Sequence, residues 1–228
     1  MLAQTDQARD YLIRQFRRKL LHWGQGNFSD FPWRHENNLF HALVAEILLQ
    51  RTRAEQVVVV YKEFREAFPD PITLGQVELS RIEKVISPLG LKWRARFLST
   101  LGGRLSEMGG QIPDDIKLLQ SLPGVGPYAA AAFLSLHAGK RAPVIDSNIV
   151  RLYGRFFGFE TGPETRRKKE ILQLAERVTP NKNFRDFNYA LIDFTRTVCR
   201  PKPVHSYCPI SDKCCFYISL SKSEFDTF

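Results

Sequence analysis

The stretch that decides the fold is "LPGVGPYAAAAFL", residues 122–134. Two glycines flank Val125, a proline and Tyr128 follow the second glycine, and an alanine-rich apolar run completes the stretch. Apolar residues keep a helical spacing on both sides of the glycines. The stretch therefore predicts two helices joined by a tight turn.

Residues that start or stop helices lie at the ends of this predicted helical hairpin. Asp114 or Asp115 can cap the first helix, and Gly139 can end the second. Pro127 after Gly126 fits the first position of a helix, because proline lacks an amide that would have no partner there. We therefore expect the second helix to begin directly at Pro127.

A turn built of glycines has a use when the partner is an anion. Phosphate oxygens can approach the backbone N–H groups of Gly124 and Gly126, and a helix N-terminus adds partial positive charge. Such a contact with the DNA backbone reads no base sequence. The alternative is an ordinary turn between helices. Leu122 and Pro123 before the turn and the net charge of +9 favour the DNA contact, which we assign to Leu122, Gly124, Val125 and Gly126.

Composition places the chain among basic globular proteins. Of its 228 residues 43% are hydrophobic, which is the usual globular range and makes disorder an unfavoured interpretation. A net charge of +9 indicates an anionic partner, nucleic acid being the commonest, although a generally basic protein without such a partner is the alternative. No apolar run is long enough to span a membrane, and residues 1–16 read as an amphipathic helix and not as a signal peptide. We expect a cytoplasmic location, nucleoid-associated in a prokaryote, or a nuclear one if the source has a nucleus.

Helical periodicity extends over nearly the whole chain. Alternating strand patterns are scarce, and "VVVVY" (57–61), although β-prone by composition, lies inside a longer helical period. Glycine and proline punctuate the sequence at short intervals. We therefore predict an all-α protein of roughly ten helices joined by short turns.

Asp146 is a carboxylate twenty residues beyond the hairpin turn, just before the next helical stretch. Its ordinary role there is to cap the helix. Held beside DNA, it could instead stabilise an oxocarbenium-like sugar or orient a water for attack at the anomeric carbon. Asn148, Arg151 and Arg155 follow closely and could support Asp146 or contact phosphate.

The hairpin and the aspartate together resemble the helix–hairpin–helix and Gly/Pro…Asp signature of the endonuclease III superfamily of DNA glycosylases. The hairpin and the aspartate carry the resemblance first, as "LPGVGPY…VIDSN". Three further segments match in the same order along the chain: "FPWRHENNLFHALVAEILLQRT" (31–52), "GLKWRARFL" (90–98) and "FRDFNYALIDFTRTVCRPKP" (184–203). The resemblance covers nearly the whole chain and is specific in its combination of motifs.

The resemblance implies a two-lobed helical fold. Residues 28–138 would form a central lobe containing the hairpin (114–138), and residues 1–27 with 139–228 a terminal lobe containing a metal-cluster loop (199–215). It also implies base excision repair on double-stranded DNA with a mismatched or damaged base, which is flipped out of the duplex, by a protein that we expect to be a monomer.

The position of Tyr128 indicates a branch of this superfamily. Members that also cleave the strand carry a lysine there, which forms a Schiff base with the sugar, and a phenol cannot do so. Adenine-removing members usually have serine there, whereas thymine–DNA mismatch glycosylases have tyrosine; both share the glutamate that Glu46 matches. The sequence is thus most similar to a monofunctional glycosylase acting on thymine or uracil mispaired with guanine.

The resemblance also implies roles for single residues. Asp146 would be the catalytic carboxylate, and Tyr128 and Glu46 would line the pocket of the flipped base. Gln50 would fill the gap left by the extruded nucleotide, and Arg51 could contact the opposite guanine or nearby phosphates.

Two of these assignments have structural alternatives. Glu46 lies among apolar residues and could be a proton donor, or a structural carboxylate paired with an arginine such as Arg34 or Arg51. Arg51 could equally be a solvated charge on a basic face.

All four cysteines (Cys199, Cys208, Cys214 and Cys215) fall in one short C-terminal segment, which indicates metal ligation and not scattered disulfides. Relatives bind a [4Fe–4S] cluster with Cys-x6-Cys-x2-Cys-x5-Cys. When Cys208 and Cys214 are aligned with the last two ligands of this pattern, Cys199 takes the first ligand position and His205 the second. Cys215 then has no place in the pattern. We favour a structural [4Fe–4S] cluster with this histidine, with structural zinc or a site without metal as alternatives.

Two other functions stay open from the sequence. Adenine removal opposite guanine or 8-oxoguanine is compatible with Glu46, but Tyr128 argues against it, as does the lack of the extra C-terminal domain of full-length members. A non-catalytic protein that binds DNA through the hairpin would leave Asp146 and Glu46 without a shared purpose.

Overall fold

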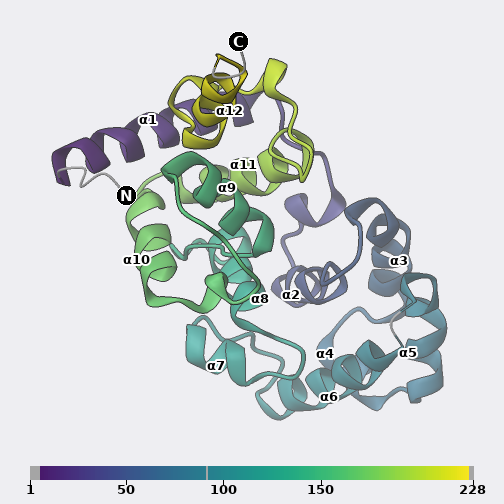
Figure 1. The fold of residues 1–228 in the computed structure, drawn as a ribbon. Helices are drawn as coiled ribbons and strands as arrows, with labels where there is room; N and C mark the ends of the chain where they lie inside the picture. Colours follow the sequence, from purple (N-terminus) through teal and green to yellow (C-terminus); the bar gives the residue numbers. More distant parts are fainter. Residues whose placement is uncertain (1–5, 91, 226–228) are drawn as a thin grey trace. The chain divides into compact units, whose positions relative to one another are not determined.

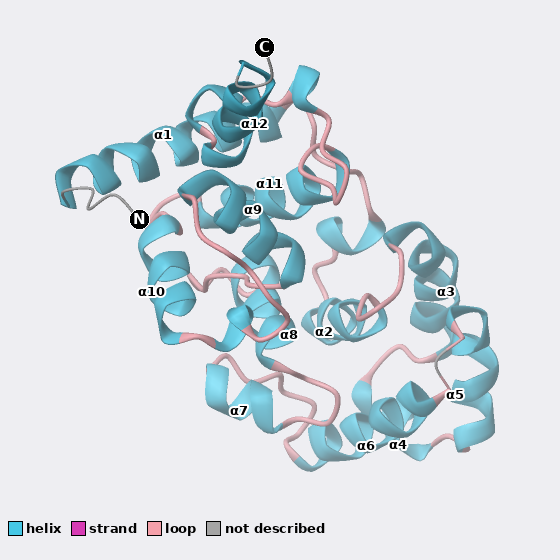
Figure 2. Ribbon diagram, in the orientation of Figure 1, coloured by secondary structure: helices cyan, strands magenta, loops and turns pink. Residues whose placement is uncertain are grey.

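Residues 6–90 and 92–225 are described by a computed structural model. Within these ranges the chain is helical and contains no strand, so the all-α prediction is confirmed (Figure 2). The β-prone segment 57–61 lies inside a helix, as its period predicted. The first five residues of the predicted amphipathic N-terminal helix lie outside the described ranges.

The described residues form twelve α-helices joined by loops and short helical turns. In chain order the α-helices are α1 (Asp6–Gln25), α2 (Leu39–Leu48), α3 (Ala54–Ala67), α4 (Pro71–Gln76), α5 (Leu79–Ile86), α6 (Trp93–Glu107), α7 (Ile116–Ser121), α8 (Pro127–Ala132), α9 (Ser147–Phe157), α10 (Lys169–Val178), α11 (Phe184–Thr197) and α12 (Cys215–Phe225). A π-helical turn, η3 (Phe133–His137), directly continues α8.

The helices belong to two compact units. The middle unit is Asp30–Lys140 and contains α2 to α8. The terminal unit combines the chain up to Ser29 with the chain from Arg141 onward, and contains α1 and α9 to α12.

The middle unit is built around α2, whose residues Phe40–Leu48 are all buried. Asn38 caps this helix by accepting hydrogen bonds from the next turn. At another contact, α4 and α6 approach backbone to backbone, and a Cβ on Gly102 would lie 2.6 Å from the backbone nitrogen of Gly75. Only glycine permits this approach.

In the terminal unit, α1 packs along α11 (Figure 1). Phe16 of α1 is fully buried in an aromatic cluster, with ring centroids 4.7 Å from Phe156 and 6.3 Å from Phe187. Rings at such distances add to the burial of their apolar surface. The packing of α1 joins the two ends of the chain in one core.

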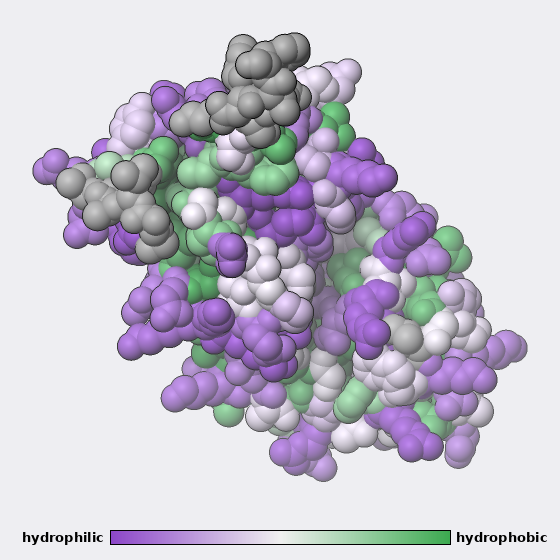
Figure 3. Space-filling model, viewed as in Figure 1, coloured by the Kyte–Doolittle hydropathy of each residue, from purple (hydrophilic) through white to green (hydrophobic). Residues whose placement is uncertain are grey.

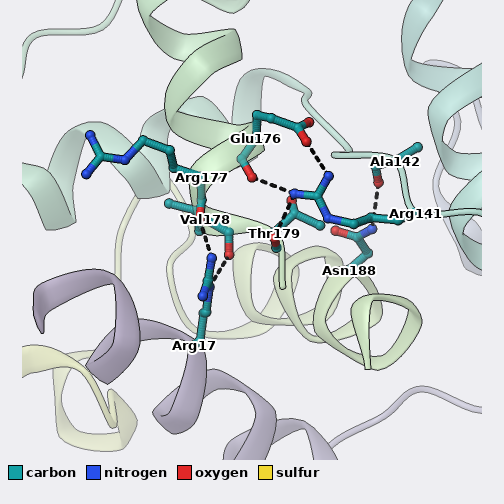
Figure 4. A network of polar contacts seen from close by, with 8 residues as sticks. All are labelled: Arg17, Arg141, Ala142, Glu176, Arg177, Val178, Thr179 and Asn188. Atoms are coloured by element: carbon teal, nitrogen blue, oxygen red, sulfur yellow. Dashed lines mark hydrogen bonds and ion pairs between the residues drawn. The ribbon is translucent and has the colours of Figure 1, made fainter. Parts of the chain in front are cut away.

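Two arginines hold the end of α10 beside the segment that leads to Asp146 (Figure 4). Arg17 donates to the carbonyl oxygen of Val178 at 2.8 Å, and Arg141 donates to those of Glu176 and Thr179 at 2.6 and 2.9 Å. These bonds satisfy carbonyls that a helix end leaves without intrahelical partners. Burial and the charge of Arg141 lower the pKa of Arg17.

On the face shown in Figure 3, hydrophilic side chains predominate and hydrophobic ones occur in small, separate groups. Among the described residues, no helix combines the length and the apolar character needed to cross a membrane.

Candidate functional site

The predicted helical hairpin lies in the middle unit. Asp115 caps α7 by accepting hydrogen bonds from the amides of Lys117 and Leu118 at 2.9 and 3.0 Å. Gly126 is the residue before α8, which begins at Pro127, so the predicted start of the second helix is confirmed. Gly139 follows η3 with a left-handed φ of +66°.

The two glycines of the turn serve different purposes. Gly124 has a φ of +78°, and a Cβ there would lie 3.3 Å from Cβ of Phe97, so the conformation requires glycine. Gly126 is exposed with open space where a Cβ would stand. Across the described residues, the amides of both glycines make no hydrogen bond, whereas Val125 donates to Leu122 at 3.1 Å. Two amide donors are thus available for an anion.

Leu122 and Val125 form the apolar part of this turn. Their side chains are only 6% and 5% exposed and belong to the core. The two residues anchor the turn, and their side chains are not available to DNA. The assignment of Leu122 and Val125 to a DNA contact stays a prediction, which the backbone of the turn would have to fulfil.

Glu46 is buried on α2, and its partner is a histidine. Oε1 of Glu46 lies 3.1 Å from Nε2 of His137, and both side chains are at most 3% exposed. The alternative pairing of Glu46 with Arg34 or Arg51 is therefore wrong. Sequence reasoning missed His137, because nothing in the spacing relates two residues 91 positions apart.

Tyr128 occupies the first turn of α8, directly after the glycine turn, and is half-buried. Its place in the fold is the one that the hairpin predicted.

Gln50 and Arg51 lie in the loop after α2, and this loop touches the hairpin. Nε2 of Gln50 donates to the carbonyl oxygen of Gly124 at 2.8 Å. Arg51 is exposed and has a left-handed φ of 57°, an uncommon conformation outside glycine. The structure therefore brings Gln50 and the glycine turn together.

A second residue that the sequence did not single out holds this loop in place. Arg94 of α6 is fully buried and donates to the carbonyl oxygen of Leu48 at 2.8 Å, to that of Gln50, and to the hydroxyl of Thr52 at 2.6 Å. Burial, with the charge of Arg51 nearby, lowers the pKa of Arg94. One guanidinium thus binds residues on both sides of Arg51.

In the terminal unit, Asp146 caps α9 as predicted. Oδ1 accepts a hydrogen bond from the amide of Ile149 at 2.7 Å, and Oδ2 accepts one from the side chain of Asn148 at 2.9 Å. Arg151 in turn donates to Oδ1 of Asn148 at 2.8 Å. Both carboxylate oxygens of Asp146 are therefore held in fixed directions.

Arginines of α9 also fasten the cysteine loop. Arg151 donates to the carbonyl oxygen of Cys199 at 2.9 Å, and Arg155 donates to those of Arg200 and Pro201 at 2.6 and 2.8 Å. The start of the loop is thus tied to the helix that Asp146 begins.

Three thiols and one imidazole line one cavity of about 20 Å³ in this loop, together with apolar side chains. These thiols and the imidazole belong to Cys199, His205, Cys208 and Cys214, and Arg155 and Tyr217 also line the cavity. Cys215 does not line it, and its Sγ lies instead against Gly158.

The donor chemistry of this cavity suits an iron–sulfur cluster or zinc, because thiolates and imidazole bind both. Without a metal, burial raises the pKa of Cys208 to about 11 and raises that of Cys214. In the part of the chain that the structure describes, no three His, Cys, Asp or Glu side chains converge as a metal site. The donors share a cavity but do not form a metal centre in this arrangement.

Comparison with known proteins gives consistent results. Residues 44–180 match the family of HhH-GPD superfamily base excision DNA repair proteins. The chain is similar to a thymine/uracil-DNA glycosylase of Pyrobaculum aerophilum, with 36% identity over 89% of this chain and 91% of that protein. Its fold matches a thermostable thymine-DNA glycosylase with a TM-score of 0.88 and 34% identity, covering 93% and 99% of the two chains. It also matches endonuclease III in a trapped covalent DNA intermediate, with a TM-score of 0.82, 23% identity, and coverage of 93% and 98%.

Proposed function

The chain belongs to the HhH-GPD superfamily of base excision DNA repair proteins, and from this premise we propose that it is a DNA glycosylase that releases thymine or uracil mispaired with guanine. It hydrolyses the N-glycosidic bond and leaves the DNA strand intact. The observation that carries the proposal is Asp146, a carboxylate held by hydrogen bonds to both oxygens at the start of α9.

In the proposed reaction, the bond between C1′ of the sugar and the base nitrogen breaks, and its electron pair leaves with the base. Asp146 stabilises the cationic, oxocarbenium-like sugar that forms. The oxygen of a water molecule then bonds to C1′, and Asp146 accepts a proton from that water. The released base takes up one proton, so that the sum of the reaction is hydrolysis.

Binding of the base and the mispair falls to residues of the middle unit. Tyr128 stacks on the extruded base, and Glu46 contacts its edge. Gln50 fills the space that the base leaves in the duplex, and Arg51, exposed beside it, contacts the opposite guanine or a phosphate. Extrusion costs least at a mispair, which favours mismatched DNA before any base is recognised.

Contact with the DNA backbone rests on the glycine turn. The amides of Gly124 and Gly126 have no hydrogen-bond partner within the described residues and sit before the N-terminus of α8, which suits a phosphate oxygen. The net charge of +9 strengthens this binding without adding sequence preference. The protein acts as a monomer on double-stranded DNA.

The cysteine loop holds a [4Fe–4S] cluster through Cys199, His205, Cys208 and Cys214 in this proposal. Their common cavity, lined mostly by apolar side chains, supports it, and the four side chains must converge to bind the cluster. The cluster supplies structure to the loop and takes no part in hydrolysis. Arg200 and Lys202 of the loop then contact phosphate.

Single-turnover base release tests the proposal. Duplexes carrying G·T, G·U, G·A and 8-oxoguanine·A are incubated with excess protein, and strand cleavage is measured with and without alkali. Release of thymine or uracil that requires alkali to break the strand is the expected result. Release of adenine alone, or tight binding without release from any duplex, would contradict the proposal.

A further inference from the structure

The pair formed by Glu46 and His137 contains a residue that the proposed function leaves without a role. Nε2 of His137 lies 3.1 Å from Oε1 of Glu46, and the two side chains are 1% and 3% exposed. An imidazole buried at hydrogen-bond distance from a carboxylate restricts the direction in which that carboxylate points. His137 is therefore placed to act on Glu46 and on nothing that reaches it from solvent.

The second ring nitrogen bears on which ring nitrogen donates to Glu46. Nδ1 of His137 is buried and has no hydrogen-bond partner among the described residues. A neutral ring protonated on Nε2 leaves only an acceptor unpaired, whereas an imidazolium would leave a charged N–H donor unpaired in the core. The contacts thus favour the arrangement in which Nε2 of His137 donates to Oε1 of Glu46.

This bond distinguishes the two oxygens of Glu46. Oε1 accepts from His137, whereas Oε2 makes no hydrogen bond within the described ranges. When the carboxyl is protonated, its proton therefore resides on Oε2; when it is ionised, Oε2 is the unpaired acceptor. In both states Oε2 is the oxygen left for a ligand.

The backbone at His137 is also unusual. The helix that begins at Pro127 changes at Phe133 into a π-helical turn, in which the amide of Ala138 bonds to the carbonyl oxygen of Phe133 at 3.0 Å. The extra residue in the turn rotates His137 relative to a regular α-helix. Such turns are rare and often occur at functional sites.

The same helix connects three parts of the site. Tyr128 lies in its first turn, the glycine turn precedes it, and His137 ends it. An element that carries the phosphate contact at one end therefore carries the partner of Glu46 at the other.

We propose that His137 is a positioning residue for Glu46: by holding Oε1, it directs Oε2 toward the edge of the extruded base. The inference rests on the proposed function, because the contact between Glu46 and the extruded base is part of that proposal. His137 itself touches no substrate. Its loss should slow base release and leave DNA affinity unchanged.

Two amide substitutions test this inference as a matched pair. In His137→Gln the side-chain amide reaches the place of Nε2 and can donate to Oε1. In His137→Asn the amide reaches only the place of Nδ1. Both variants keep a side-chain amide, and the Asn side chain is one methylene shorter than that of Gln, so the Tm of each variant is measured beside its rate. We measure single-turnover base release from G·T and G·U duplexes at saturating protein, and the Kd for the same duplexes.

His137→Asn should release base between about 10-fold and 100-fold more slowly than the wild type, because the carboxylate is no longer oriented. His137→Gln should recover the rate to within about threefold, and both variants should keep the wild-type Kd within about twofold. In a Glu46→Ala background, His137→Asn should have no further effect, because the group that it orients is gone.

The outcomes separate this inference from the function on which it rests. If the wild type releases base and His137→Asn releases it at the same rate, the positioning role alone is overturned. The same holds if His137→Asn still slows release in the Glu46→Ala background. Equally slow Asn and Gln variants also overturn it, because the donor at Nε2 would then not matter. A wild-type chain that releases no base overturns the proposed function together with the inference.

Discussion

The side-chain nitrogen of Asn148 lies 2.9 Å from Oδ2 of Asp146, so the candidate catalytic carboxylate is held by a residue two positions further along the chain. Arg151 donates to the other end of the same amide at 2.8 Å and thereby fixes which of its atoms faces Asp146. The first turn of α9 therefore orients the carboxylate as well as beginning the helix.

Asp146→Asn should separate catalysis from helix capping. Asparagine caps helices about as well as aspartate, so the free energy of unfolding should change by less than about 1 kcal/mol. The variant loses the negative charge that stabilises the sugar cation and the carboxylate that accepts a proton from water. Single-turnover release of thymine should therefore fall by at least about 10²-fold. Thermal unfolding and base release from a G·T duplex, measured on the same preparation, check both. A large loss of stability with unchanged release would contradict the assignment.

Tyr128 should leave the protein without Schiff-base chemistry. Borohydride reduction during the reaction is expected to trap no covalent complex between wild-type protein and DNA, because a phenol forms no imine. Tyr128→Lys places an amine at the start of α8 and should yield a trapped complex, which gel electrophoresis detects. Trapping by the wild type would show that another amine reaches the sugar.

Arg94 should be among the residues most needed for stability of the middle unit. Arg94→Met leaves the carbonyls of Leu48 and Gln50 without their donor and should cost about 2–4 kcal/mol. For a chain of this length the Tm should fall by roughly 5–15 °C. Arg96→Met is the matched control, since Arg96 is exposed on the same helix and should change the Tm little. Equal melting of the two variants would contradict the role of Arg94.

Glu36 should contribute stability that depends on pH. Burial acts to raise its pKa, but hydrogen bonds from the amide of Asn38 and the hydroxyl of Tyr61, and the charge of Arg65, outweigh burial and lower it below 4.5. A lowered pKa in the folded state means that this contribution is complete above about pH 4.5 and is lost as the pH falls through the folded pKa.

Glu36→Gln tests this dependence. The difference in unfolding free energy between wild type and variant, measured by urea denaturation, should be largest above about pH 5 and shrink as the pH falls below 4.5. A difference that stays constant down to pH 3 would show that the charge of Glu36 does not matter.

The cysteine loop should bind iron through three of its four cysteines. Protein purified without oxygen should contain about four iron atoms per chain and absorb broadly in the visible range. Cys208→Ser should lose both, because Cys208 lines the common cavity, whereas Cys215→Ser should keep both. Binding of a single zinc ion, or of no metal, would overturn the cluster.

Local rules predicted much of this fold because they depend on neighbouring residues. Asp115, Gly126 with Pro127, and Asp146 all mark helix starts where the sequence placed them. The twelve observed α-helices exceed the roughly ten expected, and α4, α7 and α8 have only six residues each, too short to show a clear apolar period.

The remaining features depend on residues that meet only after folding. His137 pairs with Glu46 from 91 positions away, and Arg94 reaches the loop after α2 from α6. Nor could the sequence show that Leu122 and Val125 turn their side chains into the core, because an apolar residue in a turn suits a core or a partner equally. Tertiary contacts decide such questions, and no local pattern records them.

The pairing of α1 with α11 also determines when the terminal unit can fold during synthesis. The middle unit is complete once Lys140 has left the ribosome, whereas α1 emerges first and its partner begins only at Phe184. At ordinary rates of translation, α1 waits roughly 10–30 s with the apolar face of Ile13, Phe16 and Leu20 uncovered. In nascent chains of this protein the apolar face of α1 therefore stays open to chaperones until α11 has been synthesised.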